Sequence, residues 1–231
     1  MKLLFFVLGT IFGSFFGLVA DRLPQGRSLL VPRSHCEFCQ HALQPLDLIP
    51  LISIISCRFR CRYCDHKLAV RYFWCELLTG VLFAYVSPLT WSTVWLLAWL
   101  SASFVLALID ADHLIVETRV FLFSSLFLLL SAIWLARPLY WWHVPLVLLS
   151  YAGLQLLLPA SLGRGDLWLL AFWSLFLTWY AFLLLLVIAS FSGLVFYGWQ
   201  KLQGKVLREI PFVPFLALGL TIVQLAANAG R

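Results

Sequence analysis

Two aspartates stand at the borders of long apolar segments, in a chain that offers few other charged groups. Asp110 ends the apolar run 96–109, and Asp166 opens the run 167–188 directly after Gly163-Arg164-Gly165. An ionisable side chain at the edge of a bilayer is costly, and it is by default a candidate for function. Two carboxylates that come together can share one proton and activate a water molecule. The pattern therefore predicts an aspartyl protease centre at a membrane face.

The local sequence gives the two aspartates different electrostatic surroundings. Glycines on both sides of Arg164 allow the backbone to approach closely, and Asp166 is expected in the cap or first turn of the following helix, where the helix dipole favours negative charge. Asp110, at the end of its helix, meets the opposite end of a dipole. We therefore expect Asp166 to act as the base and Asp110 to hold the shared proton. The alternatives are that Asp110 simply reaches water at a helix end and that Asp166 is a plain N-cap.

The composition excludes a soluble globular domain. Of the 231 residues, 63% are hydrophobic and 11% are charged, whereas a soluble domain carries roughly a quarter charged residues. The 11 Trp and 20 Phe suit the interfacial belts and apolar faces of a membrane protein. The net charge of +6 does not indicate a nucleic-acid partner, because the basic residues gather in particular loops. The lipid bilayer is the expected surrounding.

The apolar segments predict an all-α polytopic membrane protein with about eight transmembrane helices. One crossing needs about 20 residues. The expected spans are 3–20, 72–86, 91–109, 120–135, 144–159, 167–179, 181–200 and 212–227. The first span is expected to be retained, since it has no strongly basic start and no cleavage site. The stretch 167–200 is too long for one span and short for two, and the charge distribution assigns it two crossings.

The basic residues predict the orientation. The segment 21–71 contains half of the 16 Lys and Arg residues, and cytoplasmic loops carry the excess of these residues. Placing this segment inside and alternating eight spans leaves only Lys2, Arg137 and Arg231 outside. Both termini are then outside. The same arrangement places Asp110 and Asp166 together on the cytoplasmic side.

The segment 21–71 also has the spacing of a metal site. It contains two C-x2-C pairs separated by 21 residues, Cys36 with Cys39 and Cys61 with Cys64. Four thiolates at this spacing close a tetrahedral structural Zn²⁺ site. The alternative, two disulfides, requires an oxidising compartment, which the cytoplasmic placement opposes. His35, His41 and His66 flank the pairs and could replace one thiolate.

These features predict three parts of the chain. Residues 1–20 form the first transmembrane helix, 21–71 a small cytoplasmic zinc-binding loop domain, and 72–231 a transmembrane aspartyl peptidase domain.

Five segments resemble, in the same order, the type IV prepilin peptidases, which are membrane aspartyl proteases with a GxGD motif. They are 13–24, the two cysteine pairs with 45–53 between them, 109–113, 163–166 and 210–219. The likeness thus runs from about residue 13 to 219, and the compact length and cysteine loop are most similar to the Gram-positive competence or type IV pilus form. The resemblance implies that Asp110 and Asp166 are the catalytic pair.

The resemblance also implies the substrates and a second activity. Prepilins or pseudopilins would be cleaved after a short basic leader at the cytoplasmic membrane face. Family members with the cysteine loop often also methylate the new amino terminus with S-adenosylmethionine as the methyl donor. The chain has no recognisable motif for that cofactor, so the sequence leaves this activity open, and it does not indicate the oligomeric state. Departures from the family pattern are found at Gly17, Leu48, Glu117, Thr118 and Trp168.

Two other classes of protein remain. The chain could be a catalytically silent zinc-ribbon scaffold that docks an ATPase of pilus or secretion assembly. It could also be a transporter that uses the paired aspartates as a cation site, although no inverted repeat supports this. Replacing Asp110 or Asp166 with Asn discriminates the three, because only the peptidase then accumulates uncleaved precursor.

Overall fold

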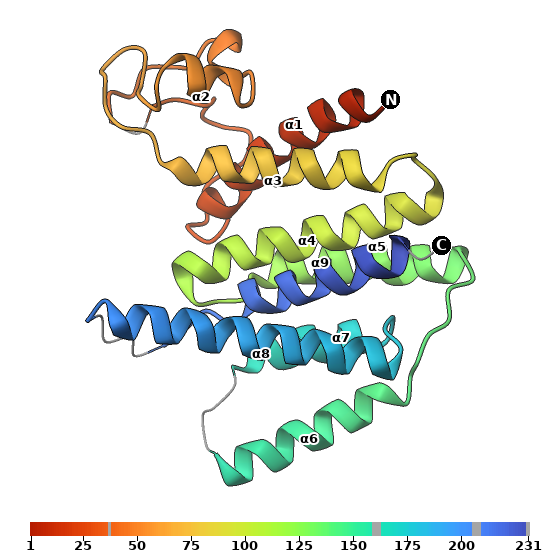
Figure 1. Cartoon of the computed structure of the whole chain (residues 1–231). Helices are drawn as coiled ribbons and strands as arrows, with labels where there is room; N and C mark the ends of the chain where they lie inside the picture. The colour runs from red at the N-terminus through yellow and green to blue at the C-terminus, as the bar shows by residue number, and fades with distance from the viewer. Residues whose placement is uncertain (37, 159–162, 205–208, 230–231) are drawn as a thin grey trace. The chain divides into compact units, whose positions relative to one another are not determined.

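A computed structural model describes residues 1–36, 38–158, 163–204 and 209–229. Pro159, Lys205, Arg208 and Arg231, which entered the span and charge predictions, lie outside the described residues. The chain divides into two compact units, Met1–Thr93 and Val94–Arg231. The regular structure of both is helical, and the chain is an all-α polytopic membrane protein (Figure 1).

In the described part of the chain, eight helices of 11 or more residues correspond to the eight predicted spans. They are α1 (Lys2–Arg22), α3 (Val70–Val86), α4 (Trp91–His113), α5 (Thr118–Trp134), α6 (His143–Leu157), α7 (Arg164–Ser174), α8 (Trp179–Leu202) and α9 (Val213–Ala229). Of these, α1, α4 and α8 are long and apolar enough to cross a membrane, and α5, α6 and α9 are shorter apolar helices. Helices suit lipid because they satisfy every backbone hydrogen bond within one segment.

The stretch 167–200 forms two helices, as the charge distribution predicted. Helix α7 ends at Ser174, and α8 begins at Trp179 with Thr178 as its N-cap, whose side chain accepts a hydrogen bond from the N–H of Ala181 at 3.3 Å. Helix α7 has 11 residues, which corresponds to roughly 16 Å of helix against a hydrocarbon core of about 30 Å. The helix found at the predicted span 167–179 is therefore shorter than one membrane crossing requires.

The first unit is built on close packing of α1 against α3 (Figure 1). A Cβ added at Gly13 would lie 2.5 Å from the carbonyl oxygen of Cys75, and one at Gly9 would lie 2.8 Å from the Cα of Gly80. Small residues thus let the two backbones meet, as in many membrane helix pairs. Between these helices, the segment 23–69 carries a short 3-10 helix (Pro45–Leu48) and α2 (Ile52–Ser56).

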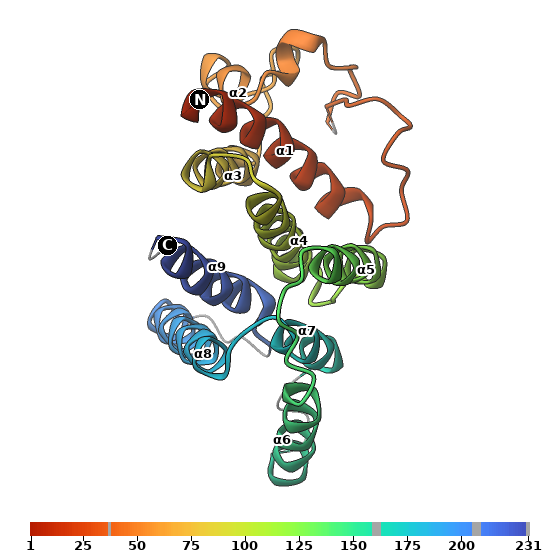
Figure 2. The same ribbon diagram turned by 90° about the vertical axis from the view of Figure 1, so that its right-hand side faces the viewer.

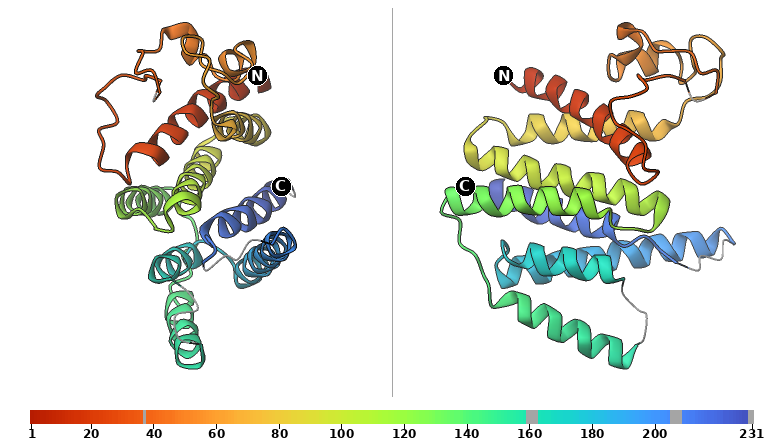
Figure 3. Two further views of the ribbon diagram at one scale, coloured as in Figure 1. Left: turned by 90° about the vertical axis from the view of Figure 1, so that its left-hand side faces the viewer. Right: turned by 180° about the vertical axis from the view of Figure 1, so that it is seen from behind.

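Among the described residues, α4 has more buried positions than the other helices of the second unit. The indole N–H of Trp95 on α4 donates to the carbonyl of Leu128 on α5 at 3.1 Å, and these helices lie side by side (Figure 3). Helices α8 and α9 also lie side by side (Figure 2), with Gly219 so close to α8 that a Cβ would lie 2.8 Å from the carbonyl oxygen of Leu185.

Candidate active site and metal centre

Asp110 lies in the last turn of α4 and is 5% exposed. Its Oδ2 accepts the backbone N–H of Val213 at 3.0 Å, and the backbone of Phe212 donates to the same carboxylate. These two donors lie at the start of α9 (Val213–Ala229), so the Asp110 carboxylate caps the N-terminus of that helix. A carboxylate at this position satisfies backbone donors that the helix itself leaves unpaired.

Asp166 lies in the first turn of α7, where the sequence placed it. Gly163 is the N-cap, with extended backbone angles, and its N–H donates to the Asp166 carboxylate. The helix dipole at this end favours a negative side chain.

Gly165, the second glycine of the Gly163–Asp166 segment, controls how closely α7 approaches the loop after α4. A Cβ added at Gly165 would lie 2.6 Å from Cγ2 and 2.9 Å from Cβ of Val116. Contacts below 3.0 Å are not tolerated without a shift. Gly165 therefore lets the start of α7 pack directly on the segment that follows Asp110.

These contacts bring the two aspartates into one site of the second unit. Their carboxylates are close enough for their charges to interact, although they belong to different helices. The structure thus places together the pair that the sequence singled out. Their catalytic role stays a prediction.

Asp110 lies at the end of α4, as expected, and the structure adds a contact that the electrostatic argument did not include. Its carboxylate also accepts hydrogen bonds at the N-terminus of α9. Nothing in the local sequence of α4 indicates this, because Val213 lies 103 residues away. The basis for assigning the shared proton to Asp110 is therefore lost, and the pair is best described as sharing one proton between coupled groups.

Two positions that depart from the family pattern lie near this site in sequence. Glu117 is the N-cap residue of α5, and its carboxylate lies 3.9 Å from the guanidinium of Arg119. Trp168 on α7 is 59% exposed. Neither the contact of Glu117 nor the exposure of Trp168 explains why these two positions depart from the family pattern.

The four predicted metal ligands come together in the first unit. The Sγ atoms of Cys36, Cys39, Cys61 and Cys64 all lie within 4.8 Å of one another. The Sγ atoms of Cys36 and Cys64 are 3.8 Å apart, which equals the separation of about 3.8 Å that a tetrahedral ion with Zn–S bonds of about 2.3 Å imposes. All six cysteines are free. The four thiols can hold one metal ion, and the disulfide alternative finds no support.

The two cysteine pairs form equivalent turns with a spacing of 25 residues, a repeat that the sequence analysis missed. In each turn the N–H of the first cysteine donates to a histidine carbonyl, Cys36 to His41 at 3.0 Å and Cys61 to His66 at 2.8 Å. Gln40 and Asp65, which follow the second cysteines, both adopt left-handed φ, 57° and 59°. The periodic recurrence of C-x2-C-x-His could have revealed this repeat.

Aromatic side chains join the two turns crosswise. The ring of Phe38 stacks on His66 at 4.3 Å between centroids, and His41 packs on Tyr63 at 3.8 Å. His41 and His66 therefore have packing partners, and the metal-ligand cluster consists of the four cysteines alone among the described residues.

Electrostatics favours the thiolate form of Cys36 and the closed form of the loop. The backbone N–H of Cys39 donates to Cys36 and, with other nearby donors, lowers the pKa of that thiol to about 7, which favours the form that binds metals. The hydroxyl of Tyr63 donates to Asp47 at 2.8 Å and lowers the pKa of that carboxyl group. Arg62 also contacts Asp47 at 3.0 Å, which fixes the 3-10 helix to the second cysteine turn.

A third buried carboxylate escaped the sequence analysis. Glu76 on α3 is 4% exposed, and its Oε2 accepts the N–H of Leu51 at 2.7 Å. Glu76 is the only charged residue in the predicted span 72–86, and a lone charge inside a span is by default a candidate for function. That signal was available in the sequence.

The helices, the four-cysteine cluster and the paired carboxylates define a polytopic membrane protein with a metal-binding loop and a candidate acid–base site. A family model described as the bacterial peptidase A24 N-terminal domain matches residues 7–89, nearly the same residues as the first unit. The chain belongs to the prepilin peptidase family, as its relatives establish.

Curated relatives of the chain carry the name prepilin leader peptidase/N-methyltransferase. The Myxococcus xanthus protein is 36% identical over 82% of this chain and 60% of its own length. The Bacillus subtilis protein is 27% identical over 99% and 96%, and the Aeromonas salmonicida protein is 30% identical over 93% and 87%. The chain thus spans about 60% of the Myxococcus relative and nearly all of the Bacillus one. No solved structure matches the chain significantly.

Proposed function

We propose that this protein is a membrane-embedded aspartyl endopeptidase that cleaves the leader from type IV prepilins or pseudopilins. The observation that supports the proposal is that Asp110 and Asp166, which belong to different helices, lie close enough for their charges to interact. The relatives' names, prepilin leader peptidase/N-methyltransferase, supply the substrate class.

The geometry suits general acid–base hydrolysis. The ionised member of the pair takes a proton from water, and the hydroxide equivalent attacks the carbonyl carbon of the scissile bond. The protonated member donates to the carbonyl oxygen and stabilises the tetrahedral intermediate. When the intermediate collapses, the C–N bond breaks and the leaving amine takes a proton from the pair. Backbone N–H groups from α9 and Gly163 hold the two carboxylates during these steps.

The metal of the loop is proposed to be zinc. Four thiolates match the ligand set of structural zinc sites, which have no open position for substrate. The ion would join the two equivalent cysteine turns and contribute folding free energy to the loop. We propose that residues 21–71 form this zinc-binding domain between the helix 1–20 and the peptidase region 72–231.

The proposed setting is the cell membrane, with the zinc loop and the two aspartates facing the cytoplasm. The support is the distribution of Lys and Arg, half of which lie in 21–71. The partners are then the membrane-anchored prepilin and the lipid bilayer.

We also propose that the protein methylates the new amino terminus of the cleaved pilin. The relatives' names support this second activity. S-adenosylmethionine would supply the methyl carbon: the lone pair of the amine nitrogen forms the new C–N bond while the C–S bond breaks, sulfur keeps that electron pair, and the amine's proton passes to water.

The first test is processing of a prepilin by the purified, reconstituted protein, read as the product's new N-terminus by mass spectrometry. Asp110→Asn and Asp166→Asn are each expected to lower the cleavage rate by at least about 100-fold, because proton transfer by one positioned group contributes that much. Asp112→Asn is the matched control and keeps the wild-type rate. Normal processing by both Asn variants would favour the silent scaffold instead.

A further inference from the structure

The segment 27–33, just after α1, forms an apolar turn between two arginines. Arg27 and Arg33 enclose the sequence SLLVP, and both arginines are exposed. Leu30 is 86% exposed and Val31 is 70% exposed. Neither arginine forms an ion pair with a described residue. Large aliphatic side chains held in water are unfavourable, so this turn lacks an apolar partner.

Hydrogen bonds hold the 27–33 turn at the end of α1. Arg22, the last residue of that helix, donates through Nη1 to the carbonyl oxygen of Ser28 at 3.1 Å and to that of Pro32 at 3.0 Å. The N–H of Arg27 donates to the carbonyl oxygen of Arg22 at 3.0 Å. The turn therefore lies within reach of one arginine side chain from the point at which the first span ends.

The length of α1 places that point at the membrane surface. Helix α1 is long and apolar enough to cross a membrane, and it has 21 residues. They correspond to roughly 31 Å of helix, close to the hydrocarbon thickness of about 30 Å. Arg22 is then expected at the level of the lipid headgroups, and the turn that it holds lies at the same level.

The backbone of the turn is already paired where it would leave water. The Oγ of Ser28 accepts the N–H of Leu30 at 3.2 Å and the N–H of Val31 at 3.3 Å. An unpaired N–H group opposes transfer into lipid. These two hydrogen bonds remove that cost and leave both aliphatic side chains on the outside of the turn.

Charge selects the partner of this surface. No residue from 22 to 36 is acidic, so the turn and its surroundings attract anions. The basic leader of the proposed substrate would be repelled. An anionic phospholipid offers both complements, because its phosphate attracts arginine and its acyl chains receive aliphatic side chains.

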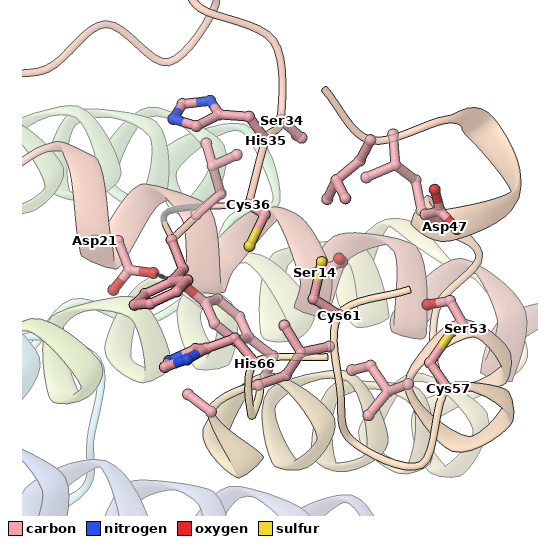
Figure 4. A pocket seen from close by; sticks show the side chains of 18 of the residues that line it. Ser14, Asp21, Ser34, His35, Cys36, Asp47, Ser53, Cys57, Cys61 and His66 are labelled. Carbon is pink, nitrogen blue, oxygen red and sulfur yellow. Dashed lines mark hydrogen bonds between the residues drawn. The ribbon is translucent and has the colours of Figure 1, made fainter. Parts of the chain in front are cut away.

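We propose that the 27–33 turn is a membrane anchor, with Leu30 and Val31 at the edge of the hydrocarbon layer and Arg27 and Arg33 on anionic phospholipid headgroups. The peptide bonds after both arginines stay in the wet headgroup layer, where a protease reaches them. Ser34 and His35 connect the turn to Cys36 (Figure 4), so the anchor also ties the metal cluster to the bilayer. The inference goes beyond the peptidase reaction and does not depend on it.

The test uses a fluorescent amino acid, dansylalanine, in place of Leu30 in the full-length protein in lipid nanodiscs. Thiol labelling is avoided because the metal cluster consists of cysteines. Lipids brominated on the acyl chains near the headgroup quench a fluorophore that touches them. In phosphatidylglycerol nanodiscs, bromination is expected to lower the emission at position 30 by at least about half, because interfacial side chains enter the acyl boundary.

The same amino acid in place of Asp65, an exposed residue of the second cysteine turn, is the control. Its emission should be quenched at least about 3-fold less, since it is expected outside the acyl layer. Equal quenching at both positions, or none at position 30, would overturn the anchor. An unquenched position 30 faces water and is a surface for a protein partner instead.

Arg27→Gln with Arg33→Gln tests the headgroup contacts. One arginine near an anionic surface favours binding by about 5-fold, so quenching at position 30 should be stronger in phosphatidylglycerol than in neutral phosphatidylcholine. The double variant should lose this difference. Arg58→Gln with Lys67→Gln removes the same charge from exposed residues elsewhere in the loop and should keep it. Equal loss in both double variants would overturn the specific role of the turn.

Hydrogen–deuterium exchange of the unmodified protein makes the outcome independent of any substitution. The amides of 28–32 are expected to exchange at least about 5-fold more slowly in phosphatidylglycerol than in phosphatidylcholine nanodiscs. The amides of 60–66 should exchange equally in both. Equal exchange of 28–32 in the two lipids would overturn the arginine contacts.

Discussion

At the scale of single residues, backbone N–H groups hold each of the carboxylates that matter here. Asp110 accepts from the start of α9, Asp166 from Gly163, and Glu76 from Leu51. Hydrogen bonds of this kind fix the position of a carboxylate and leave its second oxygen available for a ligand or a water molecule. The side chains are therefore placed for chemistry by the ends of helices and by loop backbone.

The cysteine cluster allows a prediction at this scale. Cys36→Ser should lower the metal content from about one zinc ion per chain to near zero, because three thiolates hold zinc far less tightly than four. Loss of the ion should also open the loop to proteolysis, since binding free energy is folding free energy in small zinc modules. Metal analysis and limited proteolysis of the purified protein measure both effects.

Cys57→Ser is the control, because Cys57 lies outside the four-cysteine cluster. It should keep its zinc and its resistance to protease. A Cys36→Ser protein that retains the full zinc content would contradict the assignment of the ligands.

At the scale of elements, the loop 114–117 and the start of α7 set the distance between the helices that carry the aspartates. Helix α4 ends at His113, and Leu114 turns the chain with a φ of 56°. Val116 then packs against Gly165. The second glycine of the GxGD segment is thus required by a contact with a distant loop.

Gly165→Ala should therefore impair cleavage. Its Cβ would lie 2.6 Å from Cγ2 of Val116, and relieving such overpacking typically costs about 1–3 kcal/mol. The resulting shift of α7 moves Asp166, so the cleavage rate should fall by at least about 10-fold. Cleavage assays on the reconstituted protein provide the measurement.

A second substitution at Val116 tests whether this contact is the cause. Gly165→Ala with Val116→Gly leaves the Val116 backbone N, at 3.8 Å, as the nearest atom, so activity should recover at least in part. Gly153→Ala, at a helical glycine with open space around it, is the control and should have no effect. Failure of the double variant to recover would show that Gly165 acts through something other than Val116.

The elements themselves were largely predictable from sequence, and their contacts were not. Apolar runs gave the eight long helices because a membrane helix is marked by its composition. The capping of α9 by Asp110 joins residues 103 positions apart, and neither hydrophobicity nor helical period carries that information. The cysteine cluster was predictable because spacing alone limits which thiols can share one ion. Glu76 could have been singled out as the lone charge of its predicted span, whereas its hydrogen bond to Leu51 depends on how the loop packs on α3.

At the scale of the whole molecule, charge distribution predicts which side of the membrane each segment faces. The two compact units carry different chemistry: the first has the metal cluster and the buried Glu76, and the second has the paired aspartates. Both should face the cytoplasm, where the leader of a membrane-anchored precursor is reached. The alternation of spans is the physical basis of this expectation.

Trypsin digestion of sealed vesicles tests the orientation. In inside-out vesicles, the enzyme should cleave after the exposed residues Arg27 and Arg33, whereas right-side-out vesicles should protect both sites until they are lysed. Mass spectrometry of the released peptides identifies the cut sites. Cleavage at these positions in intact right-side-out vesicles would reverse the topology.

The joint action of Asp110 and Asp166 on one reacting carbonyl is the central claim. A prepilin peptide whose scissile bond is replaced by a hydroxyethylene group mimics the tetrahedral intermediate, and such analogues bind at least about 100-fold more tightly than substrate. Its affinity is measured for wild type, Asp110→Asn, Asp166→Asn and Asp112→Asn. The account predicts that either substitution in the pair abolishes the tight binding and that Asp112→Asn retains it. Tight binding that survives loss of either partner would contradict the claim.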